Sequence, residues 1–288
     1  MKKVILLSCL LGYCLCLNAQ KTDKKLQHLL EETLKDFHGD AGVYVHDLKR
    51  NRVAAVRADS LSPTASMVKM TILTGIMDKI NRGELEYHQQ LVYKDSLLYA
   101  GSDILGSFKN DEKIELGKLI LLMLSTSDNT ASLFLQSLAG GGARINVLLD
   151  SLGFTATRVN SRTPGRQANQ RAWGWGQTTP REMATLMEKI VNHQLISDSL
   201  SERMLRLLGR NYWDEQAISA IPSDVFVASK NGAVDASRSE VLFVNGDHRR
   251  YVFCICTHNN ADTSWTPSNE ASVLIRKVSK QLWDYYKK

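Results

Sequence analysis

The pattern of apolar and polar positions divides the chain into strand-like segments near its two ends and helical segments between them. Within residues 22–38, leucines recur three and four positions apart, which predicts an amphipathic helix. Short alternating or continuous apolar runs predict strands at 42–48, 52–57, 225–230, 239–245 and 250–257. Longer runs with helical spacing predict further helices at 67–81, 115–125, 129–139, 143–151, 180–193 and about 268–286.

This order of segments predicts an α/β mixed (α+β) fold. Short polar turns separate 42–48 from 52–57 and 239–245 from 250–257, which is typical of antiparallel hairpins. Strands from both ends of the chain would then form one antiparallel five-stranded sheet flanked by helices, with an all-helical subdomain inserted between them. We therefore expect a single domain over 20–288, with a sheet subdomain at about 20–62 and 210–288 and a helical subdomain at about 63–209.

The first residues resemble an export signal. A basic Met1-Lys2-Lys3 precedes an apolar stretch at 4–17, and the small Ala19 stands just before Gln20. The apolar stretch is shorter than the roughly 20 residues that a helix needs to span a bilayer. We expect a signal peptide over 1–19, a mature chain with no stable membrane span, and a periplasmic or secreted protein. An uncleaved anchor is the alternative.

The composition limits the possible partners. Removing Lys2 and Lys3 with the signal lowers the formal net charge from +6 to +4, which does not indicate nucleic-acid binding. Of five cysteines, Cys254 and Cys256 remain, and their alternation on one strand face favours two buried thiols over a disulfide. The histidines are scattered without ligand spacing, so we expect no metal and no cofactor.

The first candidate for chemistry is Ser66-Met67-Val68-Lys69, at the start of the predicted helix 67–81. Residues three apart share one helix face, so the Lys69 amine can reach the Ser66 hydroxyl. A serine hydroxyl becomes a useful nucleophile when a base removes its proton, and burial or a second cation can lower the pKa of a lysine enough for that role. Alone, the pattern also fits a helix cap followed by a solvated lysine.

Two further motifs follow along the chain. Ser127-Asp128-Asn129 stands between two predicted helices, where it could be a simple turn and helix cap or could supply a hydroxyl and an amide to a site. Lys230-Asn231-Gly232-Ala233 ends a predicted strand. A cation beside a glycine could bind a carboxylate and allow close approach of a substrate, although an ordinary strand end has the same pattern.

Together and in this order, the motifs resemble the S-x-x-K, S-D-N and K-T-G set of penicillin-recognising serine enzymes. Their separations of about 60 and about 100 residues are similar to those of the class A β-lactamases. Thr130-Ala131 and Thr178-Thr179-Pro180 add to the likeness. The resemblance implies a β-lactamase/transpeptidase-like fold, a serine hydrolase and a small-molecule β-lactam or peptidoglycan-like substrate. We expect a monomer.

The resemblance also implies catalytic roles. Ser66 would be the nucleophile that becomes acylated, and Lys69 would be its base. Ser127 would pass a proton to the leaving nitrogen. The backbone N–H groups of Ser66 and Ala233 would form the oxyanion hole, and Lys230 would tune Ser127.

Substrate-binding roles follow in the same way. Lys230 would attract the substrate carboxylate, Asn129 would orient the side-chain amide, and Gly232 would let the substrate backbone approach. Asn231 departs from the family pattern, because Thr or Ser is usual there, and its amide would replace a hydroxyl. Arg238 would supply the additional guanidinium that class A enzymes direct at the carboxylate.

The stretch before Thr178 departs furthest from the family. Class A enzymes carry a glutamate there that activates the water for deacylation, but here Thr163-Pro164 takes the place of Glu-Pro and Gln167 takes the place of Asn. No Asp or Glu occurs from Ser151 to Arg181. Because a general base contributes about 10²–10⁴-fold, we expect acylation of Ser66 to persist and deacylation to be slow.

The same stretch is basic and aromatic. Five arginines could form a rim for an anionic substrate or could be bonded within the loop; they are Arg158, Arg162, Arg166, Arg171 and Arg181. Trp173 and Trp175 could pack the loop down or contact a ligand, and Tyr99 and Ser102 could form the opposite wall.

Two other functions stay open. One is a D-alanyl-D-alanine carboxypeptidase or transpeptidase that uses the same Ser-Lys chemistry on peptidoglycan. The other is a non-catalytic binding protein that keeps the fold.

Overall fold

A six-stranded sheet is the central layer of the structure, a computed structural model that describes residues 20–247 and 249–287. The expected signal peptide at 1–19 lies outside these residues. The strand order is β1-β3-β2-β11-β10-β9. The strands are β1 Lys21–Thr22, β2 Asp40–Asp47, β3 Arg52–Val56, β9 Phe226–Val234, β10 Ser237–Gly246 and β11 Arg249–His258. All neighbours except β1 and β3 pair antiparallel, so the expected five-stranded antiparallel sheet is confirmed.

The sixth strand was not expected. β1 is two residues long and pairs parallel with β3, just before the helix that begins at Lys24. A two-residue strand has no apolar alternation to reveal it, because its pairing depends on where the following helix leads the chain.

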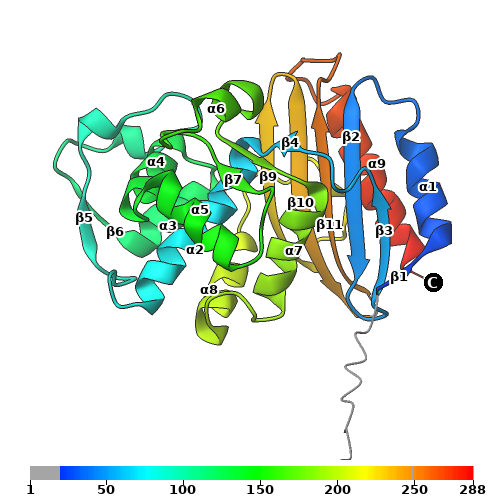
Figure 1. Cartoon of the computed structure of the whole chain (residues 1–288), viewed down its shortest axis with the longest axis horizontal. Helices are drawn as coiled ribbons and strands as arrows, with labels where there is room; N and C mark the ends of the chain where they lie inside the picture. The colour runs from blue at the N-terminus through cyan, green and yellow to red at the C-terminus, as the bar shows by residue number, and fades with distance from the viewer. Residues whose placement is uncertain (1–19, 248, 288) are drawn as a thin grey trace, which may run out of the picture.

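Helices cover both faces of the sheet (Figure 1). On one face α1 (Lys24–Leu34) and α9 (Glu270–Tyr285) pack against each other and against the strands. On the other face α7 (Pro180–Val191) packs on β2, β10 and β11. Phe253 and Ile255 of β11 therefore belong to the core under α1 and α9, whereas Cys254 and Cys256 belong to the core under α7. The two thiols are buried and free, with their sulfurs 3.7 Å apart.

The helical region lies beside the edge strand β9 (Figure 1). Its centre is α2 (Val68–Asn81), in which ten consecutive residues from Val68 to Met77 are buried. Around it lie α3 (Leu116–Ser125), α4 (Asn129–Leu138), α5 (Gly141–Ser151) and α8 (Asp198–Leu208). Each helix expected from the sequence is present, with ends shifted by a few residues.

Two helices were missed. In α8, Leu200, Met204, Leu207 and Leu208 are buried at helical spacing, so the signal was available in the sequence. The short α6 (Gln167–Trp173) has no buried residue and ends at Gly174, whose φ is 68°. An exposed helix of this kind carries no apolar period.

Short strands fasten the loop that follows α5. β4 (Ser62–Pro63), β8 (Gly176–Thr178) and β7 (Arg158–Val159) form a three-stranded sheet, and β5 (Gln90–Val92) pairs with β6 (Lys113–Glu115). The N–H of Thr64 also donates to the carbonyl of Gly176 at 3.0 Å. This sheet places the loop directly beside the segment that leads into Ser66. Among the described helices, none is long and apolar enough to cross a membrane.

Candidate active site

Ser66 and Lys69 face each other at the start of α2. Ser66 lies in a 3₁₀ turn, η1 (Ala65–Met67), that continues into the helix. Nζ of Lys69 is 3.1 Å from Oγ of Ser66. Ala65 has a φ of 42°, a left-handed conformation that turns the chain just before Ser66. The expected contact across one helical turn is therefore present.

Strand β9 passes very close to this turn. A Cβ atom on Gly232 would lie 2.4 Å from the carbonyl oxygen of Thr64 and 2.8 Å from the backbone nitrogen of Ser66. Only glycine fits such an approach of two backbones. Gly232 thus brings the neighbouring Ala233 to the same cavities as Ser66.

The second motif surrounds the amine of Lys69. Nζ lies 3.0 Å from Oγ of Ser127, 2.5 Å from its carbonyl oxygen and 3.0 Å from Oδ1 of Asn129. Ser127 has a φ of 61°, which directs both its hydroxyl and its carbonyl at the amine. Asp128 holds this turn, because its carboxylate accepts from the backbone N–H groups of Ile104 and Ala131.

Lys69 is completely buried. Burial, followed by the charge of Lys230, holds the pKa of Lys69 well below its ordinary value, while Asp128 acts in the opposite direction. A lowered pKa makes the unprotonated form of the amine easier to reach. That form can accept the proton of Ser66.

The third motif contains a second buried amine. Lys230 is fully buried in β9, and its Nζ donates to the carbonyl oxygen and to Oδ1 of Asn231 at 3.0 and 3.1 Å. Burial lowers the pKa of Lys230 to about 7, although Glu240 opposes this shift.

Glu240 was missed by the sequence interpretation. It is fully buried in β10, where its carboxylate accepts from Oγ of Ser229 at 2.5 Å and from the N–H of Ala217 at 2.8 Å. Burial raises its pKa to about 7. A glutamate inside an apolar strand was the available signal, because a buried carboxyl needs specific partners.

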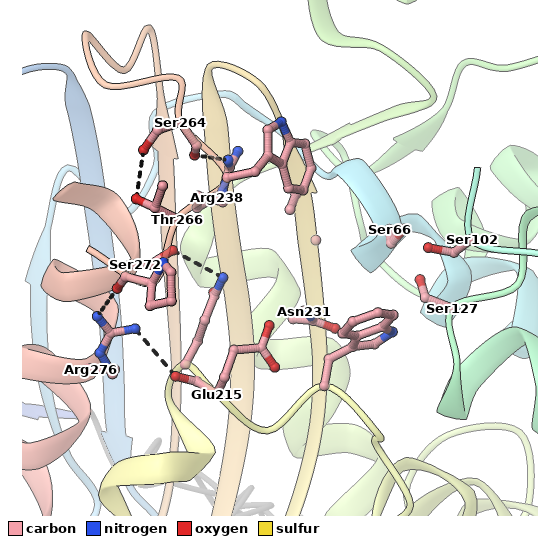
Figure 2. Close-up of a pocket in the computed structure, with 16 residues that line it drawn as sticks. Ser66, Ser102, Ser127, Glu215, Asn231, Arg238, Ser264, Thr266, Ser272 and Arg276 are labelled. Carbon is pink, nitrogen blue, oxygen red and sulfur yellow. Dashed lines mark hydrogen bonds between the residues drawn. The ribbon is translucent and has the colours of Figure 1, made fainter. Parts of the chain in front are cut away.

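Two cavities open on Ser66. The first, about 530 Å³, is lined by Ser66, Ser127, Asn231, Arg238 and further residues from the 213–216 and 264–276 segments, Trp213 and Trp265 among them, and we call it the polar cavity. Figure 2 shows Ser66, Ser102 and Ser127 on one side of it and Arg238 and Arg276 on the other.

The second cavity, about 640 Å³, continues in another direction from Ser66. It is lined by Tyr99, Asn129, Trp173, Trp175, Val234, His258 and neighbouring residues, and we call it the aromatic cavity. Tyr99 and Ser102 therefore do form walls, one in each cavity. The tryptophans both pack the loop and contact the cavity.

Arg238 lines the polar cavity, but most of its guanidinium N–H groups are engaged. They donate to the backbone carbonyls of Val234, Ser237 and Ser264, and the group lies 4.3 Å from the ring centre of Trp265. Arg276 is a second guanidinium in this lining, bonded to the carbonyls of Glu215 and Pro267. It was missed because it follows the third motif by 46 positions, on α9.

The loop before Thr178 is fastened by its own polar residues. Arg166 donates to Oδ1 of Asn160 and Oε1 of Gln177, and Arg158 pairs with Asp150. Arg181 pairs with Asp59 at 2.7 Å. Within the described part of the chain none of the five loop arginines lines either cavity, and the bonds of Arg158 and Arg166 favour the alternative of arginines bonded within the loop.

Carboxylates are scarce around Ser66. Of the described residues that line the two cavities, Glu215 is the only one with a carboxylate, and it belongs to the polar cavity. Thr163 is buried, and its hydroxyl donates to the carbonyl of Ser161. Glu182 accepts N–H groups of Thr155 and Thr157 at the start of the loop. Over 20–247 and 249–287, no three His, Cys, Asp or Glu side chains cluster to hold a metal ion.

Comparisons with known proteins agree with this geometry. Beta-lactamase AER-1 of Aeromonas hydrophila is 26% identical over 268 residues, covering 91% of this chain and 86% of the relative. The structure of PBP-A has a TM-score of 0.83 and 23% identity, covering 93% of this chain and 98% of that one. A point mutant of PBP-A, solved as an acyl-enzyme complex with penicillin G, has a TM-score of 0.82 with the same identity and coverage.

These structural likenesses establish the fold. The assignment to a family comes from a family model, described as the beta-lactamase enzyme family, that matches residues 21–286. The chain therefore belongs to the beta-lactamase enzyme family and is a β-lactamase-like serine hydrolase.

Proposed function

We propose that this protein is a secreted serine hydrolase of the class A β-lactamase type that forms an acyl-enzyme at Ser66 with β-lactams or a related acyl donor and releases the acyl group slowly. The observation that carries the proposal is the 3.1 Å contact between the buried amine of Lys69 and the hydroxyl of Ser66. The signal-like sequence at 1–19 supports export to the periplasm or the medium.

In the acylation step, Lys69 takes the proton of Ser66 while Oγ bonds to the carbonyl carbon of the donor. The N–H groups of Ser66 and Ala233 stabilise the negative oxygen that forms. The C–N bond then breaks, and the proton passes from Lys69 through Ser127 to the leaving nitrogen. The 3.0 Å distance from Lys69 to Ser127 Oγ supports this transfer.

Substrate is held by the remaining motif residues. Lys230 and Arg238 attract its carboxylate, and Asn231 supplies the polar group that is usually a hydroxyl. Asn129 orients the amide of the acyl side chain, and Gly232 leaves room for the substrate backbone. A monomer suffices for this arrangement, since each of these residues belongs to one chain.

Slow deacylation follows from the lining of the cavities. A water molecule that attacks the acyl-enzyme needs a base, and the aromatic cavity offers no carboxylate among its described residues. The hydroxyl of Thr163 is already bonded to Ser161. We therefore expect deacylation to be about 10²–10⁴-fold slower than it would be with a positioned general base.

Intact-mass measurement after incubation with penicillin G tests the proposal. A persistent adduct of one penicillin is expected, absent in Ser66→Ala and retained in Ser137→Ala, which changes an exposed serine of α4. Rapid hydrolysis without an adduct contradicts slow deacylation. Release of D-alanine from a D-alanyl-D-alanine peptide would instead indicate a carboxypeptidase, and a folded chain that no acylating probe labels would indicate a binding protein.

A further inference from the structure

The two cavities that meet at Ser66 and Ala233 have different chemical linings. The polar cavity contains charged side chains, namely Glu215, Arg238 and Arg276, together with several hydroxyls. Among the residues that the structure describes, the aromatic cavity is lined by no Asp, Glu, Lys or Arg. Trp213 and Trp265 also line the polar cavity, so the difference between the described linings is the charge, which one end of a bound substrate meets and the other end does not.

The rings of the aromatic cavity support one another. Tyr99 lies edge to face with Trp175, with ring centres 5.1 Å apart, and Trp173 lies edge to face with His258 at 5.8 Å. Burial lowers the pKa of His258, which disfavours the charged form of its ring. The carbonyl of Trp175 accepts from the N–H of Ser161, which holds the tryptophan segment in place. The cavity wall is thus a preformed aromatic surface rather than a set of free side chains.

The direction of the substrate follows from the motif residues, on the basis of the function proposed above. Ser127, which protonates the leaving nitrogen, lines the polar cavity, and Asn129, which holds the acyl amide, lines the aromatic cavity. We infer that this protein selects acyl donors whose acyl side chain is neutral and aromatic, with that side chain against Trp173 and Tyr99 and a charged or polar leaving group in the polar cavity.

The physical reason lies in desolvation. An aromatic side chain gains apolar contact and edge-to-face packing on Trp173 and Tyr99. A carboxylate or ammonium on the same side chain would lose water and meet no opposite charge, which is costly. A donor without a side chain avoids this cost but gains no contact.

Four penicillins with one nucleus test the inference. They are benzylpenicillin, its α-carboxyl analogue carbenicillin, its α-amino analogue ampicillin, and aminopenicillanic acid, which has no acyl side chain. We expect benzylpenicillin to acylate Ser66 on the order of ten-fold faster than each of the others. The rates are measured by intact mass in samples quenched at successive times. Equal rates for all four, or faster labelling by a charged analogue, overturn the inference and leave the proposed function standing. A folded chain that none of them labels overturns both.

The variant Trp173→Ala tests the role of the ring directly. In it, the ratio of the acylation rate with benzylpenicillin to that with aminopenicillanic acid is expected to fall close to one, whereas Trp173→Phe should keep most of the wild-type ratio. A ratio does not depend on the fraction of protein that is folded. The matched control is Trp283→Ala on α9, whose ring lies against Arg249 and lines neither cavity, and which should keep the wild-type ratio. An unchanged ratio in Trp173→Ala contradicts the inference.

Discussion

The carboxylate of Glu240 accepts the backbone N–H of Ala217 at 2.8 Å and so ties the middle of the sheet to the segment that lines the polar cavity. Its other oxygen accepts from Ser229, the residue before Lys230. Glu240 also opposes the effect of burial on the pKa of Lys230. One buried carboxylate therefore contacts the segment next to the polar cavity and also influences the charge of Lys230.

Glu240→Gln tests this coupling through pH. The pKa of Lys230 is already lowered to about 7, and removing the negative charge lowers it further. The protonated amine, which we propose attracts the substrate carboxylate, is lost as pH rises through this pKa. The fall in acylation rate with rising pH should therefore begin at lower pH in the variant than in the wild type. Acylation rates measured from about pH 5 to about pH 9 check this, and an unmoved profile contradicts it.

Lys69→Arg should abolish proton removal from Ser66. A guanidinium stays protonated at all accessible pH values, so the variant keeps the positive charge and loses the base. Acylation by penicillin G should fall by about 10²–10⁴-fold while circular dichroism stays unchanged. Lys280→Arg, at an exposed position of α9, is the control and should keep the wild-type rate. Rapid labelling of Lys69→Arg would show that another group is the base.

Gly232→Ala should distort the site. The added methyl group would meet backbone atoms of Thr64 and Ser66, which cannot move without moving the nucleophile. We expect a loss of about 1–3 kcal/mol in the free energy of unfolding, together with slower acylation. Gly246→Ala places the same group at 3.6 Å from its nearest neighbours and should be nearly neutral. Denaturant titration of both variants provides the comparison, and equal stabilities would contradict the prediction.

Arg166→Ala should loosen the loop that carries the aromatic residues. Its guanidinium joins Asn160 to Gln177 across the loop, and hydrogen bonds to a charged group contribute about 1.5–3 kcal/mol. A lower melting temperature and a weaker preference for benzylpenicillin are expected. Arg162→Ala removes an exposed arginine from the same loop and should change neither property. Equal melting temperatures for Arg166→Ala and Arg162→Ala would contradict the prediction.

The sequence determined those features that depend on neighbours along the chain. Leucines at helical spacing predicted the main helices, and S-x-x-K placed the Lys69 amine over Ser66 because three residues make nearly one helical turn. The order of the three motifs indicated the family. The absence of Asp and Glu from 151 to 181 needed no structure at all.

Only the tertiary structure decided the electrostatics and the walls of the site. Lys69 and Lys230 are 161 positions apart in the sequence, yet the fold buries both amines, and burial lowers the pKa of each. Arg238, which was predicted to bind substrate, lines the polar cavity, and only the structure shows that most of its donors are bonded to backbone carbonyls. Glu240 and Arg276 reach the site from other strands and helices. Desolvation and long-range contact depend on which surfaces the fold brings together, and a linear pattern does not contain that information.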